Sequence, residues 1–231
     1  MICKMNYLKF VLVITCIFMA VPGFSQTAKW DSTFRPSNFQ NKVNEFKSYP
    51  NSRKDIIFLG NSITAGTEWS ELLNRKNIKN RGISGDITFG VLERLDEVIE
   101  GKPSKVFILI GVNDISRNIP DEVILENYRK IVSRIKSGSP RTKIYFHTML
   151  PTNNTYDKFK NHYNKEEHIL WLNKALKELV AIEKITLIDL YPAFLDAEKR
   201  MDKKYTVDGL HLSLLGYARW KELLESGKYL K

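Results

Sequence analysis

The sequence has no cysteine after residue 16, and its two cysteines, Cys3 and Cys16, both lie in the first 25 residues. A chain that loses this segment has no disulfide, no thiolate metal site and no cysteine nucleophile. Beyond it, no apolar run approaches the roughly 20 residues that span a bilayer as a helix, so we expect no stable membrane span. The formal net charge is +10, but the lysines are scattered, without blocks or interleaved aromatics. This pattern favours a lysine-rich, solvated surface over nucleic-acid binding, while an anionic partner stays open.

The first 25 residues have the layout of a secretory signal peptide. Lysines precede an uncharged apolar run at residues 10–21, and small residues follow it before a predicted cut between Ser25 and Gln26. We therefore expect a signal peptide at 1–25, a lead-in segment with one helix at 26–50 and a single globular domain at 51–231. Export without disulfides suits a bacterial envelope protein, either periplasmic or secreted. An uncleaved anchor and a lipoprotein modified at Cys16 are the alternatives.

Short apolar runs alternate with segments of helical spacing after residue 50. The runs read as buried strands because they are short, continuous and rich in β-branched and aromatic residues. They lie at 55–59, 78–81, 105–110, 143–147 and 186–189, and helical spacing occurs at 91–99, 124–135, 172–180 and 217–224. This alternation predicts βαβ units and a three-layer α/β domain with a parallel sheet. Sites in such sheets form at the carboxyl ends of the strands.

Ser62 directly follows the first predicted strand, in the segment at 60–66. A serine in a strand-to-helix turn exposes its hydroxyl, and its N–H lies near a helix N-terminus, where negative charge is stabilised. Both properties suit a nucleophile. An ordinary N-cap serine is the alternative. The segment is not a G-x-S-x-G elbow, because Thr64 stands where the last glycine would be.

Two further loops supply candidate hydrogen-bond donors. Gly82 and Gly85 lie in the loop after the second strand, where the N–H of Gly85 can donate to a developing oxyanion. Asn113 follows the third strand and offers its side-chain amide at the same edge of the sheet. The alternative for both loops is that these glycines and this asparagine serve only to form turns. We expect Asp114 to order its loop rather than to act as a catalytic acid.

Asp208 and His211 lie three residues apart in a glycine-containing loop before the last predicted helix. A serine hydroxyl needs a base of near-neutral pKa, and that base needs a partner that orients it. Asp208 can hold the Nδ1–H of His211 while Nε2 faces the serine. A structural role is the alternative, as it is for the other three histidines, His147, His162 and His168. The sequence thus places along one sheet edge a nucleophile, two kinds of hydrogen-bond donor and an acid–base pair. This combination predicts a hydrolytic site.

These four segments resemble the four conserved blocks of the SGNH hydrolases, also called the GDSL family, in order and spacing. The resemblance runs from about residue 55 to the C-terminal helix. The segments at 82–86 and 208–212 are similar to those of the platelet-activating-factor acetylhydrolase catalytic subunits. The resemblance to the SGNH hydrolases implies a flavodoxin-like α/β/α fold with a five-stranded parallel sheet in the order 2-1-3-4-5. One departure is Asn61, which stands where the family usually has aspartate.

The resemblance also implies a role for each site residue, and these roles agree with the interpretation of the loops. Ser62 is the expected nucleophile, His211 its base and Asp208 the residue that orients the base. The N–H groups of Ser62 and Gly85 and the amide of Asn113 are the expected oxyanion donors. No metal or cofactor is expected, since no cluster of His, Asp and Glu has ligand spacing.

The expected reaction is hydrolysis of a short-chain acyl ester, in particular an acetyl ester of a carbohydrate. Four residues that follow strand ends are candidates for the acyl pocket: Val112, Met149, Leu150 and Tyr156. The polar and aromatic segment at 152–165 is a candidate substrate-covering loop, with a solvated loop as the alternative.

Other functions stay open at this point. Lysophospholipases and thioesterases use the same acyl-enzyme chemistry, and so does an acyltransferase with an acceptor site that excludes water. A non-catalytic glycan-binding module on the same fold would have no need of intact Ser62, Asp208 and His211. A flavodoxin-like cofactor binder would need a phosphate-cradling loop after the first strand, which is missing. The sequence does not decide the acyl chain length or the oligomeric state.

Overall fold

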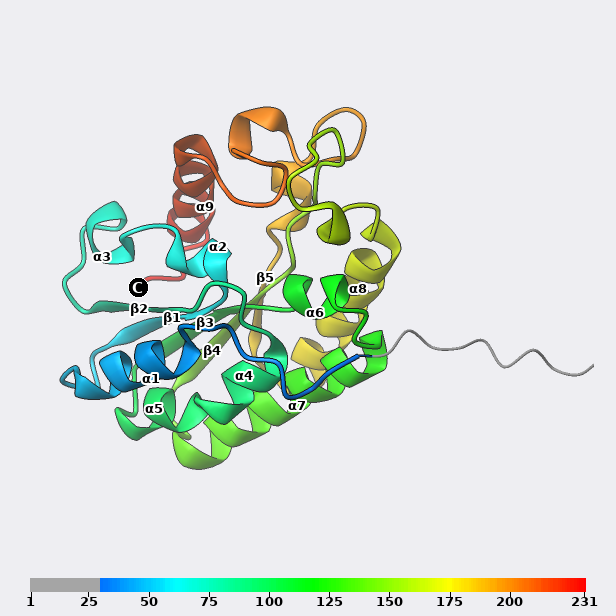
Figure 1. Ribbon diagram of the computed structural model, residues 1–231. Coiled ribbons are helices and arrows are strands. Elements are labelled where there is room, and N and C mark those ends of the chain that lie inside the picture. Colours follow the sequence, from blue (N-terminus) through cyan, green and yellow to red (C-terminus); the bar gives the residue numbers. More distant parts are fainter. Residues whose placement is uncertain (1–29) are drawn as a thin grey trace, which may run out of the picture.

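A computed structural model describes residues 30–231 of the chain (Figure 1). The predicted signal peptide and its cut between Ser25 and Gln26 lie outside these residues and stay predictions. Five strands form one parallel sheet in the expected order, β2-β1-β3-β4-β5. Each strand coincides with one of the apolar runs: β1 (Ile56–Gly60), β2 (Ile78–Gly82), β3 (Lys105–Leu109), β4 (Lys143–His147) and β5 (Thr186–Ile188). The predicted α/β fold class is therefore confirmed.

Helices cover both faces of the sheet (Figure 1). One face carries α2 (Ser62–Ala65), α3 (Trp69–Leu72) and α9 (Leu214–Ser226). The other carries α1 (Phe39–Ser48), α4 (Thr88–Glu93), α5 (Leu95–Glu100), α7 (Asp121–Gly138) and α8 (Glu166–Ile182). The short helix α6 (Val112–Ser116) follows β3, and single 3₁₀ turns lie at Lys160–His162, Tyr191–Phe194 and Lys203–Tyr205. Among residues 30–231, no helix is long and apolar enough to cross a membrane.

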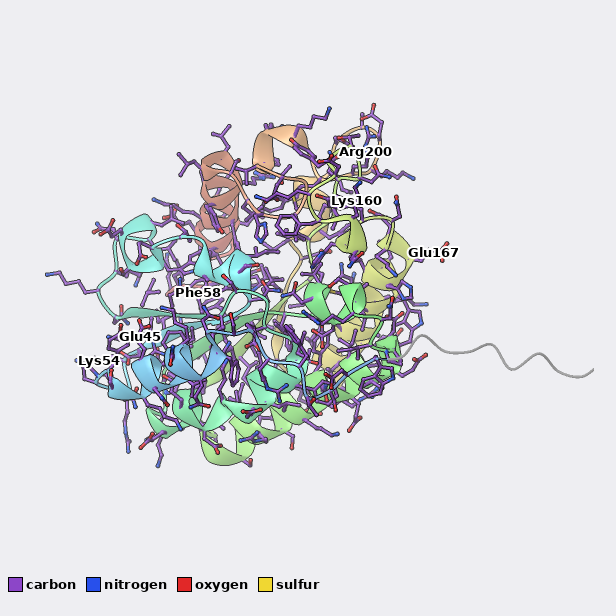
Figure 2. The ribbon with its side chains drawn as sticks, in the orientation of Figure 1. Glu45, Lys54, Phe58, Lys160, Glu167 and Arg200 are labelled. Atoms are coloured by element: carbon purple, nitrogen blue, oxygen red, sulfur yellow. The ribbon has the colours of Figure 1, made fainter. Side chains whose placement is uncertain are left out.

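The sheet is buried because its strands alternate aromatic and aliphatic side chains between two covered faces. Phe58 and Phe107 stack on adjacent strands with 4.9 Å between ring centroids, and Tyr145 continues the row at 4.5 Å from Phe107. Trp69 of α3 closes the row at 4.1 Å from Phe58, which lies in the centre of the molecule (Figure 2). Phe146 points to the opposite face, toward α7. This packing holds the strand ends, and therefore the loops that follow them, in fixed positions.

The segment at 91–99 forms two helices rather than the single helix that its spacing predicted. Arg94 interrupts it between Glu93 and Leu95, where α4 ends and α5 begins. Its guanidinium is buried, with Nε 2.9 Å from Asp86 Oδ2 and Nη2 donating to the carbonyl of Gly60 at 3.1 Å. The prediction of one helix is wrong because the buried guanidinium of Arg94 must reach the carboxylate of Asp86. The interruption of the helix at Arg94 allows this contact.

The lead-in segment contains the one helix that we expected, α1, and it packs on the loop that follows β2. Phe39, Val43 and Phe46 bury their side chains together with Ile83 in a small cluster of their own. Ile83 lies two residues before Gly85. The lead-in segment therefore supports one of the loops that carry candidate site residues.

Candidate active site

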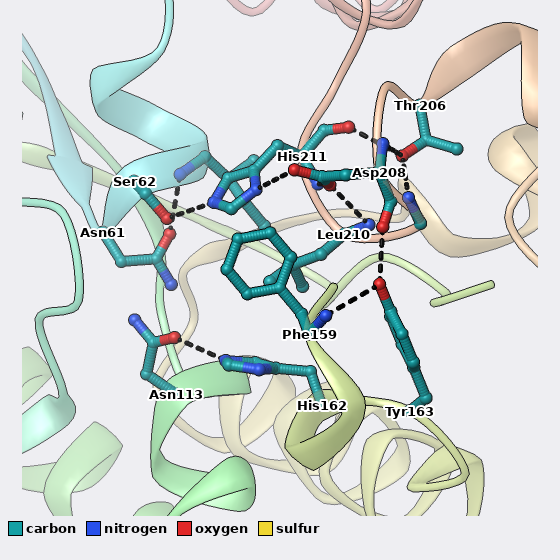
Figure 3. A network of polar contacts seen from close by, with 12 residues as sticks. Asn61, Ser62, Asn113, Phe159, His162, Tyr163, Thr206, Asp208, Leu210 and His211 are labelled. Carbon is teal, nitrogen blue, oxygen red and sulfur yellow. Dashed lines mark hydrogen bonds and ion pairs between the residues drawn. The ribbon is translucent and has the colours of Figure 1, made fainter. Parts of the chain in front are cut away.

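Ser62, His211 and Asp208 form a chain of hydrogen bonds at the carboxyl edge of the sheet (Figure 3). Ser62 is the first residue of α2, directly after β1, and its side chain is only partly buried. Its Oγ lies 2.9 Å from Nε2 of His211, and Nδ1 of His211 lies 2.9 Å from Oδ2 of Asp208. An ionised carboxylate can only accept, so Nδ1 carries the proton and Nε2 accepts from the serine hydroxyl.

The loop at 206–211 fixes the carboxylate of Asp208. Its Oδ1 accepts from the backbone N–H groups of His211 at 2.8 Å and Leu210 at 3.1 Å. Burial alone would raise the pKa of Asp208, but these bonds and the ring of His211 together lower it. Gly209 adopts a φ of +82° between them, in the left-handed region that glycine tolerates best. Asp208 therefore stays ionised and keeps the base oriented.

Two backbone N–H groups, those of Gly85 and Ser62, are the predicted backbone donors. Gly85 lies in a turn closed by a hydrogen bond of 3.1 Å from the N–H of Asp86 to the carbonyl of Ile83. Its φ of +80° is the value that the third position of a type II turn requires, which explains glycine there. Ser62 is at the N-terminus of α2, where helical N–H groups lack intrahelical partners. Within the described chain neither N–H donates a hydrogen bond, so both can receive a substrate oxygen.

Asn113 completes the set of donors that the sequence predicted. Its side chain is buried in α6, and its Nδ2 donates to the backbone carbonyl of Asp86 at 2.9 Å. Its Oδ1 lies 2.9 Å from Nε2 of His162, and its amide nitrogen lies toward Ser62 (Figure 3). An amide nitrogen has two hydrogens, so one remains to donate into the site.

Asn61 orders the turn before the serine. Its Oδ1 accepts from the N–H of Ile63 at 3.0 Å and so caps α2. An N-cap asparagine is about as favourable as an aspartate. The departure from the family pattern thus keeps the capping bond while it removes a negative charge beside Ser62.

Asp114 orders the loops behind the site, as predicted, and does not contact Ser62 or His211. Its carboxylate accepts from the N–H of Thr88 at 3.0 Å and from the Thr88 hydroxyl at 2.5 Å, which ties α6 to the start of α4. Burial raises the pKa of Asp114 to about 7, and the nearby charge of Asp86 adds to this rise, while the bonds from Thr88 oppose it.

The candidate acyl-pocket residues do not all lie together. Val112, Met149 and Leu150 line one apolar cavity, which Asn61 and Ile63 on either side of Ser62 also line, but Tyr156 lies instead beside Gly209. The cavity measures about 10 Å³, about the room of a single water. The remaining lining residues are Leu109, Ile110, Pro151 and Leu210.

The loop at 152–165 packs against the site with some of its side chains, while about half of its residues are exposed to solvent. The ring of Phe159 packs against His211, and the hydroxyl of Tyr163 donates to the carbonyl of Asp208 at 2.5 Å. His162 of the same loop reaches Asn113. The sequence pointed to the aromatic character of this loop but not to the contacts of Phe159 and His162, because no spacing or motif links them to the site.

The domain is α/β, and its parallel sheet carries a serine, a histidine and an aspartate that are hydrogen-bonded in series at the carboxyl edge. These features define a class of hydrolytic enzymes. Within that class the chain belongs to the GDSL-like Lipase/Acylhydrolase family, which matches residues 58–219. The protein is therefore an acylhydrolase, and the resemblance seen in the sequence is confirmed.

Three similar proteins illustrate the relationship. The platelet-activating factor acetylhydrolase IB subunit alpha2 of Homo sapiens is 28% identical over 172 residues, which cover 71% of this chain and 72% of that protein. The N-acylneuraminate cytidylyltransferase of Escherichia coli O18:K1:H7 is 29% identical over 184 residues, or 78% of this chain, but the chain spans only 42% of that protein. The structure of a candidate platelet activating factor from Streptococcus pneumonia is 31% identical with a TM-score of 0.76, and covers 84% of this chain and 92% of that one.

Proposed function

We propose that the protein is an exported serine esterase that removes short acyl groups, above all acetyl, from carbohydrates. The observation that carries the serine mechanism is the series of contacts from Ser62 through His211 to Asp208, with 2.9 Å at each step. The proposal of export rests on the apolar run at residues 10–21 and the small residues after it.

In the proposed mechanism His211 Nε2 takes the hydroxyl proton while Ser62 Oγ attacks the ester carbonyl. The N–H groups of Ser62 and Gly85 and the amide of Asn113 donate to the oxyanion of the tetrahedral intermediate. The protonated His211 then gives its proton to the leaving alcohol. A water that His211 deprotonates releases the acyl group by the same steps. Loss of one oxyanion donor typically lowers kcat by about 10²–10³.

The preference for a short acyl group rests on the apolar cavity that is lined by Asn61 and Ile63, the two chain neighbours of Ser62. Its volume of about 10 Å³ has no room for an alkyl chain, and its walls are nearly all apolar. Each methylene of a longer acyl chain would have to displace a packed side chain, at a cost of roughly 1–3 kcal/mol for overpacking. An acetyl group needs only space for one methyl, which supports acetyl esters as substrates.

The preference for a carbohydrate alcohol rests on a polar groove on the Asn113 side of the site. The groove measures about 340 Å³ and is lined by one aromatic ring and several hydrogen-bonding side chains, namely Trp30, Asp31, Ser116, Arg117, Asn161 and His162. Such a mixture suits a ligand rich in hydroxyl groups, because convergent polar groups fix its orientation.

Hydrolysis of a platelet-activating-factor or lysophospholipid ester is the second candidate function. It is favoured by the similarity to the platelet-activating factor acetylhydrolase subunits, which covers 71% of this chain. The two candidates share the acyl-enzyme and differ in the alcohol, which is a sugar in one and a glycerolipid in the other.

Hydrolysis of p-nitrophenyl acetate, butyrate and octanoate by residues 26–231, beside Ser62→Ala, tests the mechanism and the acyl length. We expect turnover that falls steeply from acetate to octanoate and that disappears in the Ser62 variant. Turnover that survives Ser62→Ala would rule out the serine mechanism. Absence of turnover with all three esters would instead favour a non-catalytic glycan-binding module.

An acetylated oligosaccharide and an acetyl glycerophospholipid, offered at equal concentration, then separate the two alcohols. We expect acetate release from the oligosaccharide with the higher kcat/KM, whereas preference for the phospholipid would select the second candidate. Product analysis with an added sugar acceptor distinguishes hydrolysis from acyl transfer.

A further inference from the structure

His162 holds the side chain of Asn113 from the side opposite to Asp86. Nε2 of His162 lies 2.9 Å from Oδ1 of Asn113, and Nδ2 of Asn113 donates to the backbone carbonyl of Asp86 at 2.9 Å. The amide is thus held at both ends by groups from two different loops. Asp86 lies in the loop that follows β2, and His162 lies in the segment between β4 and α8.

The bond partners determine which atom of the amide lies where. The carbonyl of Asp86 can only accept, so the nitrogen of Asn113 must face it and the oxygen must face His162. Nε2 of His162 must therefore carry a hydrogen. A flipped amide would set two oxygens against each other at Asp86 and two N–H groups against each other at His162.

The other ring nitrogen indicates that His162 is neutral. Nδ1 is buried and has no hydrogen-bond partner among the described residues. A proton on it would be a buried donor without an acceptor, which costs more than a bare lone pair. Burial, together with the electrostatic effects of His211 and Arg117, lowers the pKa of His162 to about 4, although Asp208 and the backbone of Phe159 act in the opposite direction. At neutral pH the ring is thus a fixed, uncharged N–H donor.

We propose that His162 is a positioning residue for the oxyanion hole. It holds the Asn113 amide in the orientation in which the second N–H of that amide points at the substrate carbonyl oxygen. This inference rests on the proposed serine esterase function. One amide hydrogen is used by Asp86, so the other lies in the amide plane and points into the site only while the plane is held. The N–H from His162 to Oδ1 also polarises the amide and makes its free N–H a better donor.

A double-mutant cycle with p-nitrophenyl acetate tests whether His162 acts through Asn113. We expect Asn113→Ala to lower kcat by about 10²-fold or more and His162→Leu by about tenfold, with KM little changed in both. In the Asn113→Ala background, His162→Leu should have almost no further effect, because the amide that it orients is gone. His162→Gln keeps an N–H at a similar reach and should restore most of the lost kcat.

His168→Leu is the matched control, because His168 lies in the next helix and is half-exposed, and among residues 30–231 its side chain bonds only Asp121. It should keep the kcat of the wild-type protein. An equal fall in kcat from His162→Leu with and without Asn113, or an unchanged kcat in that variant, would overturn the proposed role. Failure of the Gln variant to restore kcat would point to packing rather than to the N–H.

A readout without turnover separates this inference from the proposed function. ¹⁵N-detected NMR of the histidine rings should show His162 as the neutral Nε2–H tautomer at pH 7. The side-chain amide resonances of Asn113, assigned with Asn113→Ala, should shift in His162→Leu and return close to their original positions in His162→Gln. An Nδ1–H tautomer, or amide resonances that do not respond, would overturn the inference even in a protein with full Ser62-dependent activity. An inactive protein with these spectra would contradict only the proposed function.

Discussion

The ring of Phe159 lies edge-on against the imidazole of His211, with 4.9 Å between the ring centroids and 69° between the ring planes. This contact restricts the motion of the imidazole. An aromatic pair of this kind contributes about 0.5–1.5 kcal/mol. The loop at 152–165 thus helps to build the site and does more than cover it.

We predict that Phe159→Ala lowers kcat for p-nitrophenyl acetate by up to about tenfold, since the base then samples orientations that do not face Ser62. Phe159→Tyr keeps the ring and should retain most of the activity. Steady-state kinetics of both variants measure the effect. Equal activity in the Ala and wild-type proteins would show that Asp208 alone orients the imidazole.

Asp208→Asn should be much more damaging, although it changes few atoms. The amide can donate to Nδ1 of His211, which would place the ring proton on Nε2 and block proton transfer from Ser62. We expect kcat to fall by about 10³–10⁴. Asp202→Asn, at a partly buried cap in the same segment, is the control and should keep full activity. A loss of less than tenfold at Asp208 would mean that the backbone of the loop suffices to hold the tautomer.

Gly85→Ala tests the backbone donor of the oxyanion hole. The added Cβ has room, since its nearest neighbour is Pro36 Cγ at 3.4 Å, but the φ of +80° disfavours alanine. We expect the turn to relax and its N–H to tilt, so that kcat falls by about tenfold, part of what loss of one donor costs. Gly101→Ala, at a φ of −68°, is the control. If kcat is unchanged while stability falls, the N–H of Gly85 does not take part.

The position of the strands and of the main site residues could be predicted because both follow from sequence order. Short apolar runs become strands of a parallel sheet, and the residues after each run then meet at one edge. Ser62 and His211 are 149 positions apart, yet their places after the first strand and before the last helix predicted that they meet.

Contacts made by irregular segments could not be predicted in this way. Arg94 reads as a surface residue of an amphipathic helix, and nothing in the spacing shows that it turns inward to Asp86. His162 lies in a loop without periodicity, so its contact with Asn113 depends on how that loop folds back over the sheet. The prediction that Tyr156 lines the acyl cavity is wrong for the same reason.

Met149→Ala should widen the range of acyl groups. Met149 is 3% exposed and forms part of the wall of the small cavity, so its truncation enlarges that cavity. We expect kcat/KM for p-nitrophenyl butyrate to rise about tenfold relative to acetate, as one or two methylenes gain room. Leu176→Ala removes a similar volume from α8, away from the cavity, and should leave the ratio unchanged. An unchanged ratio in Met149→Ala would place the acyl group elsewhere.

The buried carboxyl of Asp114 should make stability depend on pH in an unusual direction. Its pKa is raised from 3.8 to about 7, mainly by burial, so between these values the folded chain binds a proton that the unfolded chain releases. The free energy of unfolding that Asp114 contributes therefore falls as pH rises from about 4 to 7, by up to about 1.4 kcal/mol per pH unit. Buried His162, with its pKa lowered to about 4, contributes the opposite slope between about 4 and 6.5.

Asp114→Asn isolates the contribution of this carboxyl, because asparagine does not titrate and its oxygen can still accept from Thr88. Urea unfolding at pH 5, 6, 7 and 8 measures both proteins. We expect the difference in unfolding free energy, wild type minus variant, to decrease steadily up to pH 7 and to level off above it. Asp96→Asn, an exposed carboxylate on α5, should give a difference with little dependence on pH. Parallel curves for wild type and Asp114→Asn would mean that the folded protein keeps Asp114 ionised, with the bonds from Thr88 outweighing its burial.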